Sequence, residues 1–378
     1  MMSGLVSPLA LVRPARIEFG VGTANRLGAW AKAQGYLRPL VIADAFNAAR
    51  VDVLELPGSV TVLSDVTPEP DIPKLQRLLA RAKGLGADLV VGFGGGSAMD
   101  LAKLASVLAD SDQAIGDVVG VNKIAAPRRA ALAQVPTTSG TGSEAGIRAL
   151  VTDPATSAKL AVESIFMLAD IAIVDPALTF TVPPHITAAT GIDAMAHCVE
   201  SYTNRKSHPM IDLYAIEGFR LVGKYLARAV RDGSDAEARA GLSLASLYGG
   251  YCLGPVNTAG GHALSYPLDS RWHVPHGAAN ALIFPHVLAF NAPVVPVKTG
   301  IVMEALGGPA TADTEAVLAH AHQFCAAMGI EMTLSGLGVP ESDLDIMADD
   351  AFAIRRLLDN NPRDIPRAAI RAIYQAAY

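Results

Sequence analysis

The sequence contains few cysteines, few charged residues and few aromatic residues. Its three cysteines, Cys198, Cys252 and Cys325, form no CxxC pair, and an odd number of them does not suggest a disulfide-stabilised fold. Only 17% of the residues are charged, the net charge is −6 and no run of Lys or Arg occurs, which argues against a nucleic-acid-binding protein. No uninterrupted apolar run reaches about 18 residues, so we expect no transmembrane helix.

The N-terminal residues lack a basic stretch followed by an apolar run, so we expect no signal peptide. Together with the unpaired cysteines, this favours a cytoplasmic protein with no membrane and no nucleic-acid partner. The 378 residues, 51% of them hydrophobic, are enough for two domains with large cores.

The two halves of the chain have different patterns. Buried strands without polar alternation are expected at 40–43, 60–63, 89–93 and 172–174, and they alternate with helical stretches such as 72–84 and 98–108. This alternation predicts a parallel sheet covered on both faces. After Pro183 the apolar residues recur at helical spacing, namely at 210–228, 236–247, 314–328 and 365–377. We therefore predict an α/β domain over 1–182 and an all-helical domain over 183–378.

A glycine-rich turn follows the strand at 89–93 and begins a helix. Gly94, Gly95 and Gly96 with Ser97 would let a phosphate approach the backbone N–H groups of the helix start. The turn is no Walker A loop, because no Gly-Lys-Ser/Thr follows, and it does not fit GxGxxG. Read alone, it predicts a pyrophosphate site or simply a tight strand–helix turn.

Two other polar features belong to the same predicted sheet edge. Asp44 ends a strand, where its carboxylate could bind a ribose hydroxyl or could cap a helix. The loop at 136–144 offers hydroxyl and amide donors to a cofactor, although it could also be an ordinary surface loop. Its candidate cofactor residues are Thr137, Thr138, Thr141 and Ser143.

Four side chains of the second half could bind a metal. Asp193 and His197 are four residues apart in a helical segment, so they share one face, as a metal site or as a solvated pair would. His262 and His276 follow, and the four together would suit Fe²⁺ or Zn²⁺. His273 competes with His276. The remaining histidines, His185, His208, His286, His320 and His322, look structural or lie in loops.

The motifs, in order, resemble those of the iron-containing (group III) alcohol dehydrogenases over nearly the whole chain. The matching segments are 16–20 with Gly22, Gly94–Ser97 with Asp100 and Lys103, 136–144, Lys159 with 173–176, 191–201, 275–277 with Asn280, and 361–363.

The resemblance implies a Rossmann-like N-terminal domain and an all-helical C-terminal domain, the two-domain plan shared with dehydroquinate synthase, with cofactor and metal between them. It places the metal on Asp193, His197, His262 and His276, and so selects His276 over His273. It adds Asp100 and Lys159 to the cofactor site. It also implies NAD, Fe²⁺ as the expected metal with Zn²⁺ as the alternative, and a homodimer.

One position departs from the family pattern. Many members carry a histidine four residues after the third ligand, where this chain has Tyr266. A tyrosine normally titrates at roughly pH 10, so it exchanges protons less easily than imidazole at neutral pH. His273 is a candidate for this proton transfer if it reaches the metal. Tyrosine here resembles branches that act on alcohols bearing an acidic group.

We therefore expect an NAD-dependent alcohol dehydrogenase or aldehyde reductase, in which the metal polarises the oxygen of a small alcohol or aldehyde and the nicotinamide exchanges hydride with it. One alternative is a dehydroquinate-synthase-like lyase, which needs more basic residues than occur near these motifs. Another is a non-catalytic nucleotide-binding protein, which would not need four metal-binding side chains.

Overall fold

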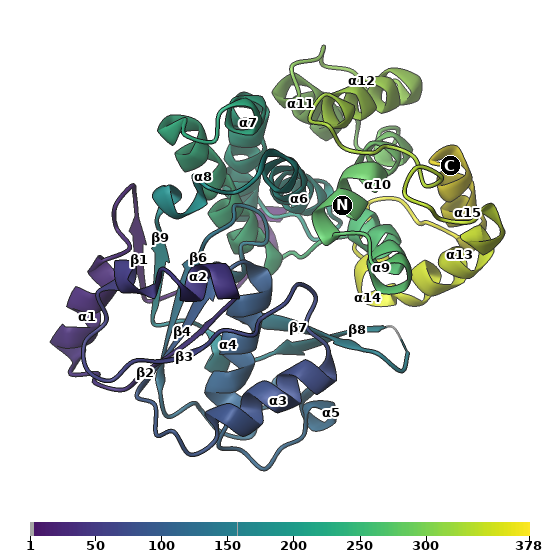
Figure 1. Ribbon diagram of the computed structural model, residues 1–378. Helices are drawn as coiled ribbons and strands as arrows, with labels where there is room; N and C mark the ends of the chain where they lie inside the picture. The colour runs from purple at the N-terminus through teal and green to yellow at the C-terminus, as the bar shows by residue number, and fades with distance from the viewer. Residues whose placement is uncertain (1–3, 157) are drawn as a thin grey trace. The chain divides into compact units, whose positions relative to one another are not determined.

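The computed structural model describes residues 4–156 and 158–378 and divides into two compact units (Figure 1). The first runs from Val12 to Phe180 and contains the strands. The second comprises Thr181–Tyr378 together with the segment that ends at Leu11. The predicted fold class, an α/β part followed by a helical part, is confirmed.

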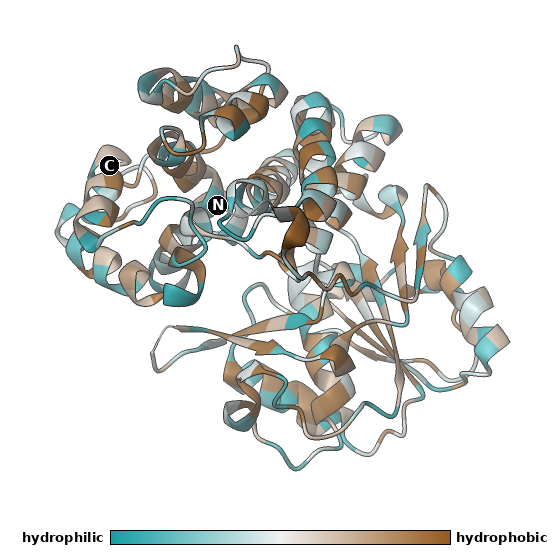
Figure 2. Ribbon diagram, turned by 180° about the vertical axis from the view of Figure 1, so that it is seen from behind, coloured by the Kyte–Doolittle hydropathy of each residue, from teal (hydrophilic) through white to brown (hydrophobic). Residues whose placement is uncertain are grey.

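The α/β unit is built on a six-stranded, fully parallel sheet of order β1-β9-β6-β4-β2-β3. Strands β2 and β4 are buried on both faces, as their apolar sequences predict, and Figure 2 shows the central strands in brown. Strand β6 is equally buried but was not predicted, because Gln134 interrupts its apolar sequence. The strands are β1 (Arg16–Phe19), β2 (Pro39–Ala43), β3 (Thr61–Leu63), β4 (Leu89–Gly94), β6 (Ala131–Pro136) and β9 (Ile171–Val174).

Separate cores cover the two faces of this sheet. Leu40 and Ile42 pack with α3 and α4, whereas the alternate residues Val41 and Ala43 pack with α1 on the other face. The helices of this unit are α1 (Arg26–Gln34), α2 (Ala45–Ala48), α3 (Ile72–Ala82), α4 (Gly96–Leu108) and α5 (Ile115–Val118). Helix α4 begins two residues earlier than predicted, because the glycines themselves form its first turn.

A small second sheet, of order β5-β8-β7, was not predicted. Its strands are β5 (Gly120–Val121), β7 (Arg148–Asp153) and β8 (Ala158–Glu163), and β7 pairs with β8 in antiparallel register. The sequences of β7 and β8 mix charged and apolar residues, and both strands are only partly buried. They therefore lack the continuous apolar run that reveals the central strands.

The second unit is helical, and no strand occurs in its described residues. Its helices are α6 (Pro184–Thr203), α7 (Pro209–Arg231), α8 (Ala236–Leu253), α9 (Gly260–Trp272), α10 (His276–Asn291), α11 (Pro296–Ala305), α12 (Thr314–Ala326), α13 (Leu344–Ala353), α14 (Arg355–Leu358) and α15 (Arg367–Ala376). No helix in the described ranges is both long and apolar enough to cross a membrane.

Helix α10 joins the two cores of the helical unit. Phe284 and Leu288 pack with α6, α7 and α8, whereas Leu282 and Ile283 pack with α9, α13 and α15. A helix that is apolar on all sides is stable only when it is enclosed, so α10 forms the centre of the unit. Its first residue, His276, is therefore anchored to a helix that is buried over most of its length.

Candidate metal centre

Helix α6 presents three polar side chains on one face. Asp193, His197 and Glu200 follow one another at i, i+4 and i+7, so they stack along the helix. They are buried, with exposed fractions of 2%, 5% and 6%. Because buried ionisable groups need partners, this face must contact other polar groups.

Helices α9 and α10 supply these partners, and both pack against α6. His262 is the third residue of α9, and His276 is the first residue of α10. The two helices are joined by a short turn in which His273 adopts a left-handed conformation, with φ of 55°. This turn reverses the chain at once and brings His276 back beside His262, with ring centroids 5.5 Å apart.

The three imidazoles converge on one carboxylate oxygen. The Nε2 atoms of His197, His262 and His276 lie 3.8, 3.5 and 3.7 Å from Oδ1 of Asp193. Ligands that bind a tetrahedral ion at about 2.1 Å are separated by about 3.4 Å, so the observed spacing suits a divalent cation. Of the four residues proposed from the sequence, Asp193, His262 and His276 each offer a ligand atom within 4.8 Å of the other two. His197 stands beside this group, 3.8 Å from Asp193 Oδ1.

Asn280, one turn after His276 on α10, lies inside this group of atoms. Its Nδ2 donates a hydrogen bond of 2.7 Å to Asp193 Oδ1 and lies 3.2 Å from Nε2 of both His262 and His276. The amide nitrogen therefore stands where the ligand atoms of Asp193, His262 and His276 converge. A bound cation would require the Asn280 side chain to turn, and its buried Oδ1 makes no hydrogen bond to any described residue in the present arrangement.

Two carboxylates contact the outer nitrogens of the imidazoles. Glu200 Oε1 lies 2.6 Å from His262 Nδ1, and Asp269 Oδ2 lies 3.5 Å from His276 Nδ1. Such carboxylates fix the ring tautomer, so that Nε2 keeps its lone pair for a metal. Neither residue was proposed as a site residue from the sequence. The helical spacing could have revealed them. Glu200 follows Asp193 by seven residues, and Asp269 follows His262 by seven, so each shares a helix face with a proposed ligand.

Burial and charge shift the pKa values of this cluster in different directions. Burial lowers the pKa of His197 to about 4, so this imidazole is neutral at pH 7. Burial opposes the charge of His262, but Glu200 and Asp193 raise its pKa to about 10. Burial also opposes the charge of Asp193, yet the three imidazoles hold its pKa well below the usual range. Without a metal, a proton supplies the positive charge that a cation would bring.

The two residues proposed for proton transfer lie in different surroundings. Tyr266 is buried one turn after His262, and its ring lies 5.7 Å from that of His276 and 6.4 Å from that of His262. His273 ends α9 and is exposed, and the structure does not bring it into the cluster.

The glycine turn of the α/β unit has a backbone that favours glycine. Gly94 has a φ of 157°, and a Cβ there would lie 2.8 Å from that of Ala98. Gly95 caps α4 without a side chain, and Ser97 lies in the first turn. Since the first N–H groups of a helix have no acceptor within it, this turn can bind an anion.

The polar residues predicted around this turn are close to it. Asp44 caps α2 through the N–H of Asn47, and its Oδ2 lies 3.4 Å from where a Cβ of Gly94 would be. Thr138 and Thr141 occupy the equivalent space beside Gly95 and Gly96. Strands β4 and β6 are neighbours, which explains why the two loops meet.

The remaining predicted cofactor residues form internal contacts. Thr137 accepts a hydrogen bond from Asn47. Ser143 donates to Asp100, 2.5 Å away, and accepts from Lys103, 2.7 Å away. Lys159, on β8, pairs with Glu69.

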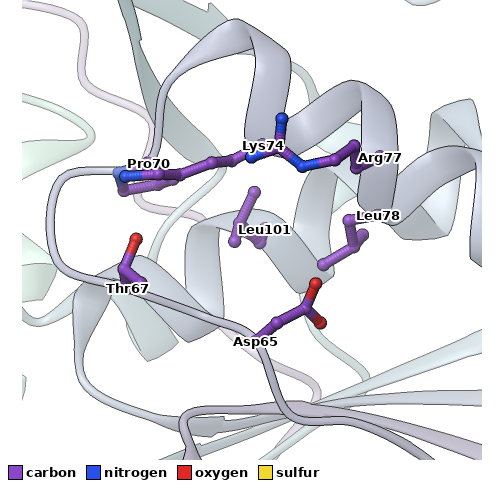
Figure 3. Close-up of a pocket in the computed structure, with 7 residues that line it drawn as sticks. All are labelled: Asp65, Thr67, Pro70, Lys74, Arg77, Leu78 and Leu101. Carbon is purple, nitrogen blue, oxygen red and sulfur yellow. The ribbon is translucent and has the colours of Figure 1, made fainter.

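A separate cavity of about 140 Å³ lies between α3, α4 and the loop before α3 (Figure 3). Lys74 and Arg77 line it from α3, and Asp65 and Thr67 line it from the loop. None of the predicted cofactor residues contributes to it, so it is distinct from the glycine turn.

Comparisons with known proteins identify both parts of the chain. Residues 14–176 match the family model for iron-containing alcohol dehydrogenase, and residues 187–378 match the model for the C-terminal part of the Fe-containing alcohol dehydrogenase family. The chain is 37% identical to long-chain-alcohol dehydrogenase 1 of Geobacillus thermodenitrificans, over 99% of this chain and 98% of that protein.

Two further relatives are both named sulfoacetaldehyde reductase. Sulfoacetaldehyde reductase of Bilophila wadsworthia is 37% identical over 82% of each chain. The structure of sulfoacetaldehyde reductase from Bifidobacterium kashiwanohense in complex with NAD+ has a TM-score of 0.87 at 27% identity, covering 98% of this chain and 99% of that one. This chain therefore belongs to the iron-containing alcohol dehydrogenase family, and it is an NAD-dependent, metal-containing oxidoreductase of alcohols or aldehydes.

Proposed function

We propose that Asp193, His197, His262 and His276 hold the catalytic metal, with Fe²⁺ preferred and Zn²⁺ as the alternative. The observation that carries this proposal is the convergence of three Nε2 atoms on Asp193 Oδ1 at 3.5–3.8 Å. When bound, the metal polarises the oxygen of the alcohol or aldehyde, and NAD(H) exchanges hydride with its carbon.

The protein's own groups prepare this site. Glu200 and Asp269 orient two of the imidazoles, and α6, α9 and α10 bury the cluster from bulk water. The side chain of His276 keeps an exposed fraction of 22%, against 2% for His262. We expect the substrate oxygen, and the water that exchanges its proton, to approach on the His276 side, with Tyr266 bordering that path.

In the α/β unit, we propose that Gly94, Gly95, Gly96 and Ser97 bind the pyrophosphate of NAD through backbone N–H groups. The carboxylate of Asp44 lies beside Gly94, where it could accept a hydrogen bond from a ribose hydroxyl and would repel a 2′-phosphate. We further propose that the loop residues Thr137, Thr138, Thr141 and Ser143, with Asp100 and Lys159, complete this surface.

The relatives carry names with different substrates, a long-chain alcohol in one case and sulfoacetaldehyde in another. The substrate class therefore has to come from the residues around the cluster. We also propose a homodimer in the cytoplasm, in keeping with three cysteines that are buried and free.

Metal analysis tests the centre. We expect His262→Ala to lose the bound metal and hydride transfer, whereas the matched variant of an exposed histidine, His185→Ala, should keep both. Chelation should abolish activity, and re-added Fe²⁺ or Zn²⁺ should restore it. Full activity in metal-free protein would contradict the proposal. NADH should appear in stoichiometric amounts with oxidised alcohol, whereas a lyase of the dehydroquinate synthase kind would return its NAD unchanged.

Gly95→Ala tests the cofactor turn separately. The backbone of Gly95 allows a side chain, and its nearest neighbour would be Thr138 Oγ1 at 3.4 Å, so the variant should fold. A methyl group there would still obstruct the approach of a pyrophosphate. We expect NAD to bind at least about tenfold more weakly, a loss of about 1.4 kcal/mol, in a calorimetric titration. Unchanged NAD affinity would place the pyrophosphate elsewhere.

A further inference from the structure

Arg356 lies one aromatic ring away from the histidine cluster of the helical unit. It belongs to α14, and its guanidinium carbon is 5.6 Å from the centroid of the Tyr266 ring. The same ring lies 5.7 Å from the ring of His276 and 6.4 Å from that of His262. Tyr266 therefore lies close both to a cation, at a distance typical of cation–π pairs, and to two imidazoles of the cluster.

The cluster is open on this same side. His276 is its most exposed imidazole, with 22% of the side chain accessible, whereas the side chains of His197 and His262 retain 7% and 2%. The ring of Tyr266 is closer to His276 than to His262. A small molecule that reaches the cluster past His276 thus comes near Tyr266 and the arginine above it.

The guanidinium of Arg356 remains available for a ligand. Arg356 is exposed, and no carboxylate within the described ranges pairs with it, whereas its neighbour Arg355 pairs with Asp359. Arg271 pairs with Asp350, and Arg367 pairs with two aspartates of α13. The guanidinium of Arg356 lies 5.6 Å from the centre of the Tyr266 ring, and arginine can bind an oxyanion through paired hydrogen bonds.

We propose that Arg356, held against Tyr266, selects substrates that carry an anionic group a short chain away from the reacting carbon. The fitting chemistry is an oxo- or hydroxy-alkanesulfonate or carboxylate, whose oxygen reaches the cluster while its anionic end reaches the guanidinium. Tyrosine at position 266 supplies a flat, uncharged surface for the cation, whereas a protonated imidazole there would repel it. This inference rests on the proposed function and adds the substrate class.

A comparison of charged and uncharged aldehydes tests the inference. We would measure kcat/KM for sulfoacetaldehyde, for a short ω-oxo carboxylate and for propanal. In Arg356→Gln we expect the preference for the anionic aldehydes over propanal to fall about 10- to 100-fold, mainly through KM, because a charged hydrogen bond is lost. Arg356→Lys should recover part of it. The matched variant Arg355→Gln should keep the preference, because Arg355 already pairs with Asp359.

The two anionic arms identify the preferred group. If Arg356→Gln loses its preference for both anionic aldehydes, Arg356 accepts any short anion. If it loses its preference for only one of them, Arg356 selects that anionic group, the sulfonate or the carboxylate. An unchanged preference in Arg356→Gln would overturn the inference. Turnover of propanal but of neither anionic aldehyde would also overturn it. If the wild-type protein exchanges hydride with no alcohol or aldehyde, long-chain ones included, the proposed function fails instead, so the two failures can be told apart.

Binding provides a readout that is independent of turnover. Calorimetric titration of the metal- and NADH-loaded protein with 2-hydroxyethanesulfonate, an alcohol that NADH cannot react with, should give a Kd that rises about tenfold or more in Arg356→Gln. The wild-type Kd should also rise with salt, because the contact is ionic and exposed. Equal Kd values for the wild type and the variant would count against a contact with Arg356.

Discussion

Glu200 and Asp269 face the outer nitrogens of two imidazoles rather than the metal position itself, Glu200 at hydrogen-bond distance and Asp269 at 3.5 Å. Glu200 Oε1 lies 2.6 Å from His262 Nδ1, and Oε2 accepts the backbone N–H of Ala259. Because the carboxylate is fixed from both sides, the imidazole cannot rotate or exchange its tautomer without losing a buried hydrogen bond. The affinity of the centre for metal therefore depends on a residue that does not ligate it.

We expect Glu200→Gln to weaken metal binding about 10- to 100-fold, since an amide holds His262 less firmly than a carboxylate. The dissociation constant can be measured by competition with a metal-sensitive dye. Glu217→Gln, on the exposed side of α7, is the matched control and should bind metal as the wild type does. Equal affinities in both variants would show that Glu200 does not orient the ligand.

Glu144 gives the α/β unit a dependence on pH. Burial raises its pKa to about 7 against the opposing charge of Lys103, and neither carboxylate oxygen has a hydrogen-bond partner among the described residues. The folded protein therefore holds this proton more tightly than the unfolded chain, and stability is lost as pH rises from about 4.5 through about 7. Relative to Glu144→Gln, the wild type should lose up to roughly 3 kcal/mol between pH 4.5 and 8. Urea unfolding at several pH values in this range measures the free energy of unfolding of both proteins. If the two free energies depend on pH in the same way, the prediction is wrong.

Sequence reasoning worked unevenly for single residues. Asp193 and His197 were found because they recur at helical spacing, and the resemblance to a family added His276. Glu200 and Asp269 could have been found by extending the same spacing by one more turn. Asn280 belongs to a family motif, but the sequence does not predict its contact with the ligand atoms. That contact depends on how α10 packs against α6 and α9.

Close helix packing shapes the helical unit at the level of its elements. Gly223 on α7 faces α11, and a Cβ there would lie 1.9 Å from the carbonyl oxygen of Ala305. A backbone atom cannot move aside as a flexible side chain can, so the two helices would have to separate. The glycine is therefore required by packing, although its φ is not left-handed.

Gly223→Ala should lower the free energy of unfolding by about 1–3 kcal/mol through this overlap. Gly254→Ala is the matched control, because no atom of the described residues lies within 4 Å of where its Cβ would be, and its φ is negative. The control should be neutral or slightly stabilising, by less than about 1 kcal/mol. Denaturant unfolding followed by circular dichroism compares them, and equal losses would argue against the overlap.

At the same scale, the sequence predicted most clearly the elements that are buried on every side. Strands β2, β4 and β9 were expected because apolar residues occupy each position, which only a double-sided sheet requires. Strands β7 and β8 were not predicted, because charged and polar residues interrupt the apolar sequence of each strand. Helix α10 was also missed, since an apolar sequence without a polar face carries no helical period.

The whole molecule consists of two units with separate cores, and each carries one of the proposed binding sites. The chain has two tryptophans, Trp30 on α1 and Trp272 on α9, so each unit contains its own fluorescent reporter. A ligand that binds only the folded form stabilises its unit by about 2.7 kcal/mol at a hundredfold excess over Kd.

Chelation should therefore lower the melting temperature reported by Trp272, measured in Trp30→Phe, by several degrees. Added NAD should raise the melting temperature reported by Trp30, measured in Trp272→Phe. The physical reason is that the metal ligands all belong to the helical unit, whereas the glycine turn belongs to the α/β unit. If chelation instead shifted the Trp30 signal alone, the assignment of the two sites would be wrong.

The helical unit is discontinuous, since Leu9 and Leu11 pack against the core that α6, α7 and α8 form. During synthesis this segment leaves the ribosome well before the helices that cover it. The α/β unit from Val12 to Phe180 can complete its core as soon as it has left the exit tunnel, whereas these two leucines must wait for some 170 further residues before their binding surface begins to appear. Leu9 and Leu11 thus leave the ribosome before the α/β unit but are buried after it, which makes their exposure to chaperones and proteases a property of the chain's connectivity.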